Sequence, residues 1–242
     1  MKGFRFLVIG LVVASALTRG QSLRAQPAQD PAVVEVRQTI DAARKEIEAY
    51  RKAGGATAAA DHPAVKWDAA LWAYREKYPR TDAAAQATTE AVRQLVRAEL
   101  WDRVQDRVVS LDVNDAAWER VATSVYEAGI ARKNLPSSID TLSSVADQTT
   151  TPAIKAAVLI VVGRAYRRQQ DFAAAIRSLE AARAAAPGTP RAEEAEGLIY
   201  EITYLRVGLP APPIAGKTRT GQTIDLAALR GKPVVLVFWG TT

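Results

Sequence analysis

The chain has 242 residues, a formal net charge of +6 and 48% hydrophobic residues, enough apolar material for a sizeable buried core. It contains no cysteine, so a disulfide, a zinc–thiolate site and a lipid-modified cysteine are excluded within these residues. Lysine and arginine are scattered among aspartate and glutamate without a basic block, and this pattern does not support a nucleic-acid-binding surface.

Residues 1–25 have the layout of a secretory signal peptide. Lys2 and Arg5 precede the apolar run 6–17, and small residues follow near Ala25. We expect cleavage after Ala25, because the apolar run is shorter than the roughly 20 residues that span a bilayer. An uncleaved membrane anchor is the alternative. Cleavage removes four basic residues and no acidic one, so the net charge falls from +6 to +2. We therefore expect an exported protein, periplasmic or otherwise extracytoplasmic.

Residues 26–206 are predicted to form one helical region. Val36, Ile40 and Ala43 recur at spacings of four and three, which predicts an amphipathic helix that ends at the glycine pair 54–55. Pro63 begins a second helix, which stops at the Tyr-Pro pair 78–79. Its apolar residues fall into two stripes, which predicts burial between neighbours on two sides; the stripes are Val65, Ala69 and Trp72, and Trp67, Leu71, Tyr74 and Tyr78.

The middle of the helical region begins with an alanine-rich run capped by Thr81 or Asp82. The run continues to residue 111 as one long helix or as two. Asp115 is then predicted to cap a helix, and a short helix is expected to start at Ser137 or Ser138. Thr151 is a cap followed by a proline at the first helical position, where the missing N–H has no cost.

Residues 156–189 carry the clearest repeat pattern. The small residues Gly163 and Ala175 fall where two helices must approach closely, and Asp171 is positioned to cap the second helix. The spacing resembles the tetratricopeptide repeat, a helix-turn-helix unit. The matching residues are Leu159, Gly163, Tyr166, Ala175, Leu179, Ala182 and Pro187.

A second repeat is expected to begin at about residue 190. Gly197 and Tyr200 follow Gly163 and Tyr166 by 34 residues each, which is the repeat period. A buried strand at 157–162 is the alternative, since a short apolar run has no decisive periodicity. Stacked repeats offer a groove for an extended peptide or a partner helix. The plainer interpretation is that the helices space or dimerise the protein.

No catalytic or metal-binding constellation is apparent in the chain. His62 is the only histidine, and its position before Pro63 favours a structural role at a helix start. Pairs of acidic residues such as Glu193 and Glu194, and the arginine cluster beginning at Arg164, are expected to be solvated helix faces. We expect no cofactor.

The character of the sequence changes at residue 207. Prolines break the helical pattern, and five consecutive apolar residues at 234–238 predict a strand covered on both faces. The segment 207–242 resembles the opening of thioredoxin-like thiol-disulfide oxidoreductases of the TlpA/ResA type. The residues that carry the resemblance are Pro212, Gly221, Gly231, Lys232, Phe238 and Trp239.

This resemblance implies a hairpin with arms 217–220 and 223–225 around Gly221, followed by a turn at 226–229 capped by Asp225. It also implies a Cys-x-x-Cys pair directly after Thr242, where a helix N-terminus lowers the thiol pKa and exchange runs through a mixed disulfide. Trp239 would shield the pair. The implied partners are protein thiols or disulfides and an upstream electron donor.

The predicted fold class is therefore mainly α: a tetratricopeptide-like helical solenoid at 26–206, then the incomplete start of a thioredoxin-like α/β domain at 207–242. The predicted function is the N-terminal part of an exported disulfide reductase, and the 242 residues alone should be inactive. One alternative is a peroxiredoxin-type antioxidant enzyme, whose opening segment is similar. Another is a non-enzymatic repeat module that binds peptides.

Overall fold

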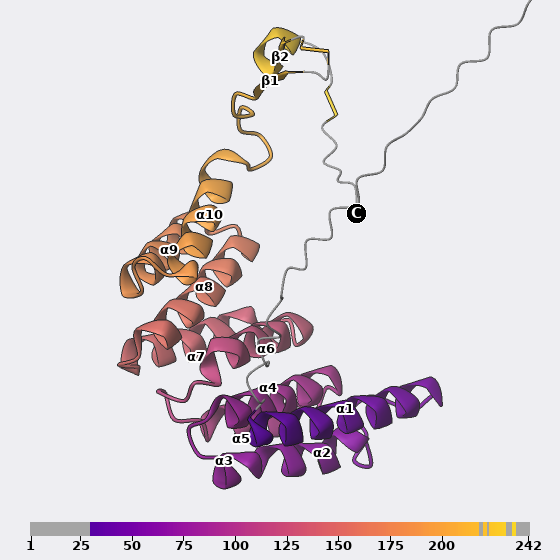
Figure 1. Cartoon of the computed structure of the whole chain (residues 1–242). Coiled ribbons are helices and arrows are strands. Elements are labelled where there is room, and N and C mark those ends of the chain that lie inside the picture. Colours follow the sequence, from indigo (N-terminus) through magenta and orange to yellow (C-terminus); the bar gives the residue numbers. More distant parts are fainter. Residues whose placement is uncertain (1–29, 218–219, 222, 231–233, 236–242) are drawn as a thin grey trace, which may run out of the picture.

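The computed structural model describes residues 30–217, 220–221, 223–230 and 234–235, and the predicted signal peptide lies outside them. The described chain is mainly α-helical, as predicted, with a small two-stranded sheet after the last helix (Figure 1). The helices are α1 (Pro31–Lys52), α2 (Pro63–Trp72), α3 (Tyr74–Lys77), α4 (Asp82–Arg97), α5 (Trp101–Val109), α6 (Trp118–Ala131), α7 (Leu135–Gln148), α8 (Pro152–Arg168), α9 (Phe172–Ala185) and α10 (Pro190–Tyr204).

The first helix follows its predicted pattern. Val36, Ile40 and Ala43 are buried along one face of α1, and the Asp30 side chain accepts a hydrogen bond from the Ala32 N–H at its start. The helix ends before Gly54, whose φ of 81° is a left-handed conformation that suits glycine.

The second helix begins at Pro63 as expected. Of the two predicted apolar stripes, the one through Leu71 and Tyr74 is buried, whereas Ala69 of the other stripe is exposed. Asp68 is buried as well, although it was not part of either stripe. A carboxylate takes one of the buried positions because arginines from another helix pair with it, as described below.

The alanine-rich run forms two helices, α4 and α5. Thr81 caps α4 through its side chain, which accepts from the Ala84 N–H. The break falls at Glu99, which has a φ of 56°, and the Leu100 N–H returns to the Leu95 carbonyl. Small alanines cover much of α4, so α1, α2 and α6 all pack closely against it.

The next helical pair differs from prediction at one end. Asp115 accepts a hydrogen bond from the Ala117 N–H just before α6, near its predicted capping position. Helix α7 begins at Leu135, ahead of the predicted start at Ser137 or Ser138, with Pro136 in its first turn. It runs for 14 residues, so it is not the short helix that was expected.

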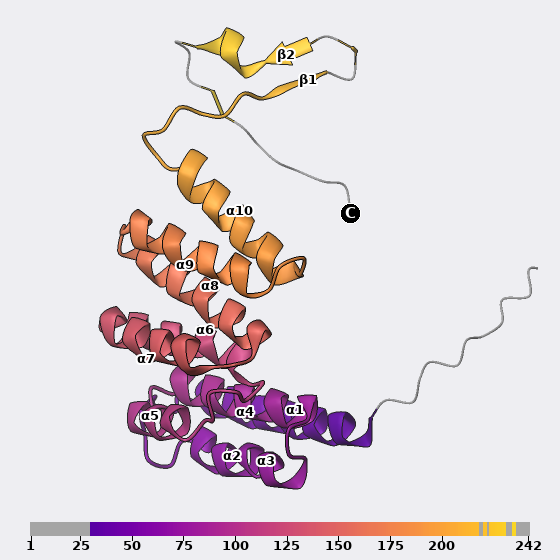
Figure 2. The same ribbon diagram turned by 90° about the vertical axis from the view of Figure 1, so that its left-hand side faces the viewer.

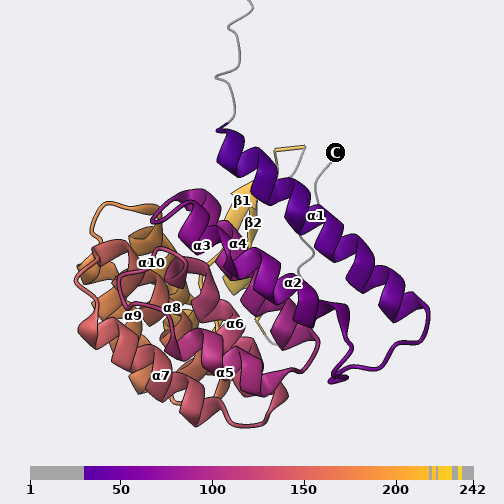
Figure 3. The same ribbon diagram turned by 90° about the horizontal axis from the view of Figure 1, so that it is seen from below.

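The helices stack in layers, with α2 and α3 at one end and α10 at the other (Figure 2). Helices α4, α6, α8 and α10 pack one on the next, while α7 and α9 each pair with the helix before them. Helix α1 lies on the outside of α2 and α4 at one end of the stack (Figure 3). One apolar core runs from α4 to α8, with smaller cores under α1–α4 and between α8 and α10.

The tail forms a short hairpin beyond α10. Strands β1 (Ala215–Lys217) and β2 (Thr223–Asp225) are antiparallel, with Lys217 opposite Thr223. The first arm lies at 215–217, ahead of the expected 217–220. Asp225 accepts from the Ala227 N–H and caps the 3-10 turn Leu226–Leu229, as expected. Val234 and Val235 are exposed and not in a strand; the rest of the predicted strand 234–238 lies outside the described residues.

Within the described residues, no helix combines the length and apolar character needed to cross a membrane.

Candidate functional site

Helices α8 and α9 form the helix pair where the repeat pattern was strongest. The predicted alternative of a strand at 157–162 is wrong, because these residues lie within α8. Ala175, Leu179 and Ala182 are buried on the α9 face that meets α8, and Asp171 caps α9 by accepting from the Ala174 N–H. Leu159 and Tyr166 are partly buried against the same cluster, while Pro187 lies just after α9 and is exposed.

Helices α8 and α9 approach each other closely at Gly163. A Cβ added there would come within 2.7 Å of Leu179 Cγ and 3.3 Å of the Ala175 carbonyl oxygen. Since real Cβ atoms do not approach other atoms to 2.7 Å, only glycine fits without a shift of the Leu179 side chain or of α9. The small residue at this position therefore sets the distance between the helices.

Helix α10 begins at Pro190, where the second repeat was expected, and packs on α9 and α8. Its glycine, however, has open space around it: a Cβ on Gly197 would meet no atom within 4 Å. Tyr200, which follows Tyr166 by 34 residues, is 47% exposed. Within the described chain, no helix occupies on α10 the position that α9 occupies on α8.

Two ion pairs join α8 to α10. Arg164 binds Glu194 at 2.8 Å, and Arg167 binds Glu201 at 2.7 Å. Arg164 is solvent-exposed, as predicted for a solvated helix face, and the sequence did not indicate its pairing with Glu194, which is partly exposed. Pairs with this exposure contribute little to stability.

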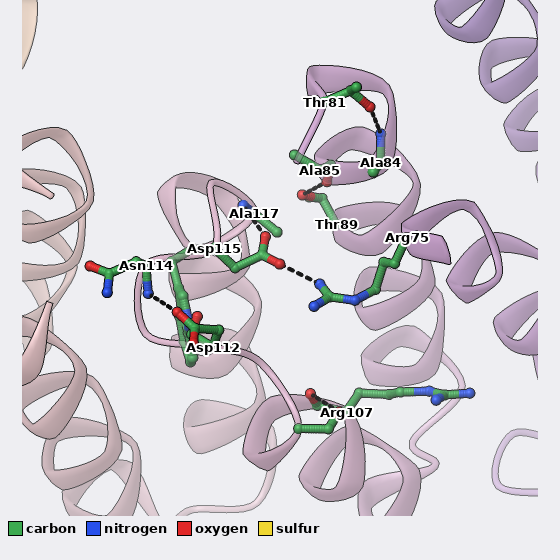
Figure 4. A network of polar contacts seen from close by, with 12 residues as sticks. Arg75, Thr81, Ala84, Ala85, Thr89, Arg107, Asp112, Asn114, Asp115 and Ala117 are labelled. Atoms are coloured by element: carbon green, nitrogen blue, oxygen red, sulfur yellow. Dashed lines mark hydrogen bonds and ion pairs between the residues drawn. The ribbon is translucent and has the colours of Figure 1, made fainter. Parts of the chain in front are cut away.

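A polar network fixes the junction between α3 and α6 (Figure 4). Arg75 on α3 donates to one carboxylate oxygen of Asp115, whose other oxygen accepts from the Ala117 N–H. Nearby, Asn114 Oδ1 accepts from the hydroxyl of Thr149 and so holds the end of α7. These hydrogen bonds hold the ends of α6 and α7 in place. They give Arg75, Asp115 and Asn114 a structural role that requires no catalytic one.

Two buried carboxylates were missed by the sequence analysis. The Asp68 side chain is 1% exposed and receives two hydrogen bonds from Arg107 of α5, at 2.8 and 3.0 Å. The Glu90 side chain is 2% exposed and receives two from Arg44 of α1, both at 2.8 Å. Arg93 also pairs with Glu90. Each carboxylate thus clamps two helices together.

The environment of Glu90 keeps it ionised. Burial alone would raise its pKa, but hydrogen bonds from Arg44 and Gln94 and the charges of Arg44 and Arg93 outweigh burial and lower the pKa below its ordinary value. Its partners all come from α1 and α4, and Glu90 itself does not line the cavity that Arg44 and Gln94 border. We interpret this carboxylate as structural, not catalytic.

The residues that carry the oxidoreductase resemblance are only partly within the described chain. Pro212 lies between α10 and β1, and Gly221 lies in the hairpin turn with a φ of 84°. Gly231, Lys232, Phe238 and Trp239 lie outside the described residues. The described part of this motif brings together no titratable groups that could perform thiol exchange.

His62 has the helix-start role that was predicted. Its Nδ1 accepts a hydrogen bond from the Ala64 N–H at 3.0 Å and caps α2. In the part of the chain that the structure describes, no three histidine, cysteine, aspartate or glutamate side chains gather to form a metal site.

Comparisons of the chain with protein-family models, with curated proteins and with solved structures found no match.

Proposed function

We propose that this chain is a helical-repeat scaffold joined to the start of an exported thioredoxin-like thiol-disulfide oxidoreductase domain. The observation that carries the proposal is the order of elements after α10. A proline-containing linker leads to the β1–β2 hairpin, and Asp225 then caps a single turn before the glycine at position 231. The family resemblance implies this order, and the hairpin and capped turn support it.

In this proposal, helices α1–α10 form a tetratricopeptide-like solenoid. The α8–α9 pair supports this assignment, because Gly163 and Leu179 meet at the small and large positions of the repeat pattern. The stacking of α4, α6, α8 and α10 on one another is the arrangement that a repeat array requires. The solenoid would present the redox domain or bind the peptide that the domain reduces.

The reactive sulfur atoms in this proposal belong to a Cys-x-x-Cys pair that follows Thr242, because residues 1–242 contain no cysteine. The first thiolate attacks a substrate disulfide, a mixed disulfide forms, and the second thiolate releases the reduced substrate while the pair becomes oxidised. An upstream donor then returns two electrons to the pair. Reduction at this site needs no other cofactor.

The experiment compares the 242-residue chain with the product of the complete open reading frame in thiol-dependent insulin reduction. We expect turnover by the complete product, no turnover by residues 1–242, and loss of turnover when both cysteines of the complete product become serine. Consumption of hydrogen peroxide without insulin reduction would favour the peroxiredoxin alternative. Insulin reduction by residues 1–242 would overturn the proposal.

A further inference from the structure

A cavity of about 620 Å³ opens between the last turns of α1, the loop that leads to α2 and the end of α4. Its volume is in the range of small-molecule sites. Ile47 gives it an apolar wall, and its polar lining includes three arginines and one glutamate. These residues belong neither to the α8–α10 repeats nor to the tail, so the proposed redox function gives the cavity no role.

His62 supplies a buried hydrogen-bond donor to this cavity. The residue is 6% exposed, and the Tyr50 ring packs against its imidazole with 4.9 Å between ring centroids. Nδ1 accepts from the Ala64 N–H, so in the neutral ring the proton is on Nε2. Burial lowers the pKa of His62, against the opposing charge of Asp61, and favours this neutral form.

The Nε2 atom of His62 has no hydrogen-bond partner among the described residues. Solvent nevertheless reaches Nε2, and His62 is one of the residues that line the cavity. Since solvent reaches this donor, an anionic ligand would replace a hydrogen bond to water with a stronger, charge-assisted one.

The charged side chains around the cavity also favour a ligand that accepts hydrogen bonds. The guanidinium groups of Arg51 and Arg97 form no hydrogen bond or ion pair within the described chain, although Arg51 is close enough to Glu48 to lower its pKa. Glu48 itself is paired with Lys52 at 2.7 Å. Arg44 is held on the buried Glu90. Two guanidinium groups thus remain available, and the nearby carboxylates already have cationic partners.

The ends of α1 and α4 do not cancel this positive charge. A helix C-terminus carries partial negative charge through its free carbonyls. Here most of the final carbonyls accept hydrogen bonds from the turns that follow, with donors that include Ala53 and Gly55 after α1 and Leu100 after α4. The Ala98 carbonyl accepts from Ala58. The polar groups that the cavity offers to a ligand are therefore mainly hydrogen-bond donors.

We propose that this cavity binds a small organic anion through a carboxylate or phosphate group, with His62 Nε2 and the guanidinium groups of Arg51 and Arg97 as donors. Guanidinium groups match the planar geometry of a carboxylate or phosphate and strengthen such hydrogen bonds. Ile47 contacts the apolar part of the ligand.

The test uses the fact that His62 is the only histidine, so its imidazole signals in NMR spectra need no assignment. Succinate and inorganic phosphate are titrated separately into residues 30–242, with sodium chloride at equal ionic strength as the control. We expect one of the two probes to shift the His62 signals saturably, which also tells a carboxylate ligand from a phosphate. No saturable shift with either probe up to about 10 mM would overturn the proposal.

Three variants separate binding from folding. Arg97→Gln should weaken the effective probe about tenfold or more. Arg177→Gln, an exposed change on α9, should have no effect. His62→Asn keeps an oxygen acceptor for the Ala64 N–H and removes the Nε2 donor, so it should keep the helical circular dichroism and lose affinity, followed through backbone amide signals. Equal weakening by Arg97→Gln and Arg177→Gln would contradict a site in this cavity.

Discussion

The side chain of Leu179 lies against Gly163, so close that a Cβ on the glycine would come within 2.7 Å of Leu179 Cγ. The equivalent glycine 34 residues later, Gly197, has no atom within 4 Å of such a Cβ. Glycine is therefore required by packing at position 163 in α8, whereas packing places no such restriction on position 197 in α10. This contrast gives the first prediction.

Gly163→Ala should destabilise the protein, and Gly197→Ala should stabilise it. Overpacking against α9 costs about 1–3 kcal/mol, which exceeds the helix-propensity gain of about 1 kcal/mol at the first site and is absent at the second. Urea unfolding at neutral pH measures both variants against the parent chain. Destabilisation by Gly197→Ala would show that its face of α10 is covered in solution.

Asp68 forms ion pairs with Arg107 and with Arg103, and loss of the Arg107 pair should lower the stability of the protein more. Arg107→Gln leaves a buried charge without its bidentate partner and should cost about 3 kcal/mol. Arg103→Gln is the matched control on the same helix, because Arg103 lies 3.6 Å from Asp68 and is half exposed; it should cost under about 1 kcal/mol. Equal losses in thermal or urea unfolding would contradict this ranking.

Stability should fall in acid partly through Glu90. Its pKa is lower in the folded protein than the unfolded value of about 4.3, so its contribution is present above that value and is lost as the pH falls through the folded pKa. Glu90→Gln should therefore be less stable than the parent at pH 7 and show a shallower loss below about pH 4. Urea unfolding at several pH values measures this. Glu180→Gln, an exposed change on α9, should leave the parent slope unchanged.

Removal of the tail after Arg206 should leave the helical stack nearly intact. Val207, Leu209 and Ile214 are exposed, and β1 and β2 pair with each other, so the described part of the tail covers little of the helical core. We expect circular dichroism and the melting transition to change only slightly. Ending the chain after Gln169 is the contrasting case, since loss of α9 and α10 uncovers Ile160 and should lower the melting temperature markedly.

Local chemistry made many helix boundaries predictable. Pro63, Thr81 and Asp171 begin or cap the helices expected of them, because a proline or a short polar side chain acts within its own turn. The break at Glu99 was not predictable, since a non-glycine residue at positive φ reflects the packing of α4 and α5 on their neighbours.

Long-range pairing was invisible in the sequence. Asp68 and Arg107 are 39 residues apart, and a carboxylate in a helical pattern is more often solvated than buried. The donor role of His62 Nε2 was missed for a similar reason. The sequence indicated a helix start at Pro63, but the cavity beside His62 needs α1 and α4 in place. Likewise, which face of α10 is exposed depends on how α10 packs on α8 and α9, and the sequence of α10 alone does not show this.

The most direct test of the proposed function is the nucleotide sequence after codon 242. We expect a Cys-x-x-Cys pair encoded directly downstream, in frame with the apolar residues 234–238. A stop codon at this position, or a downstream frame without a cysteine pair, would contradict the assignment of this chain to a thiol-disulfide oxidoreductase.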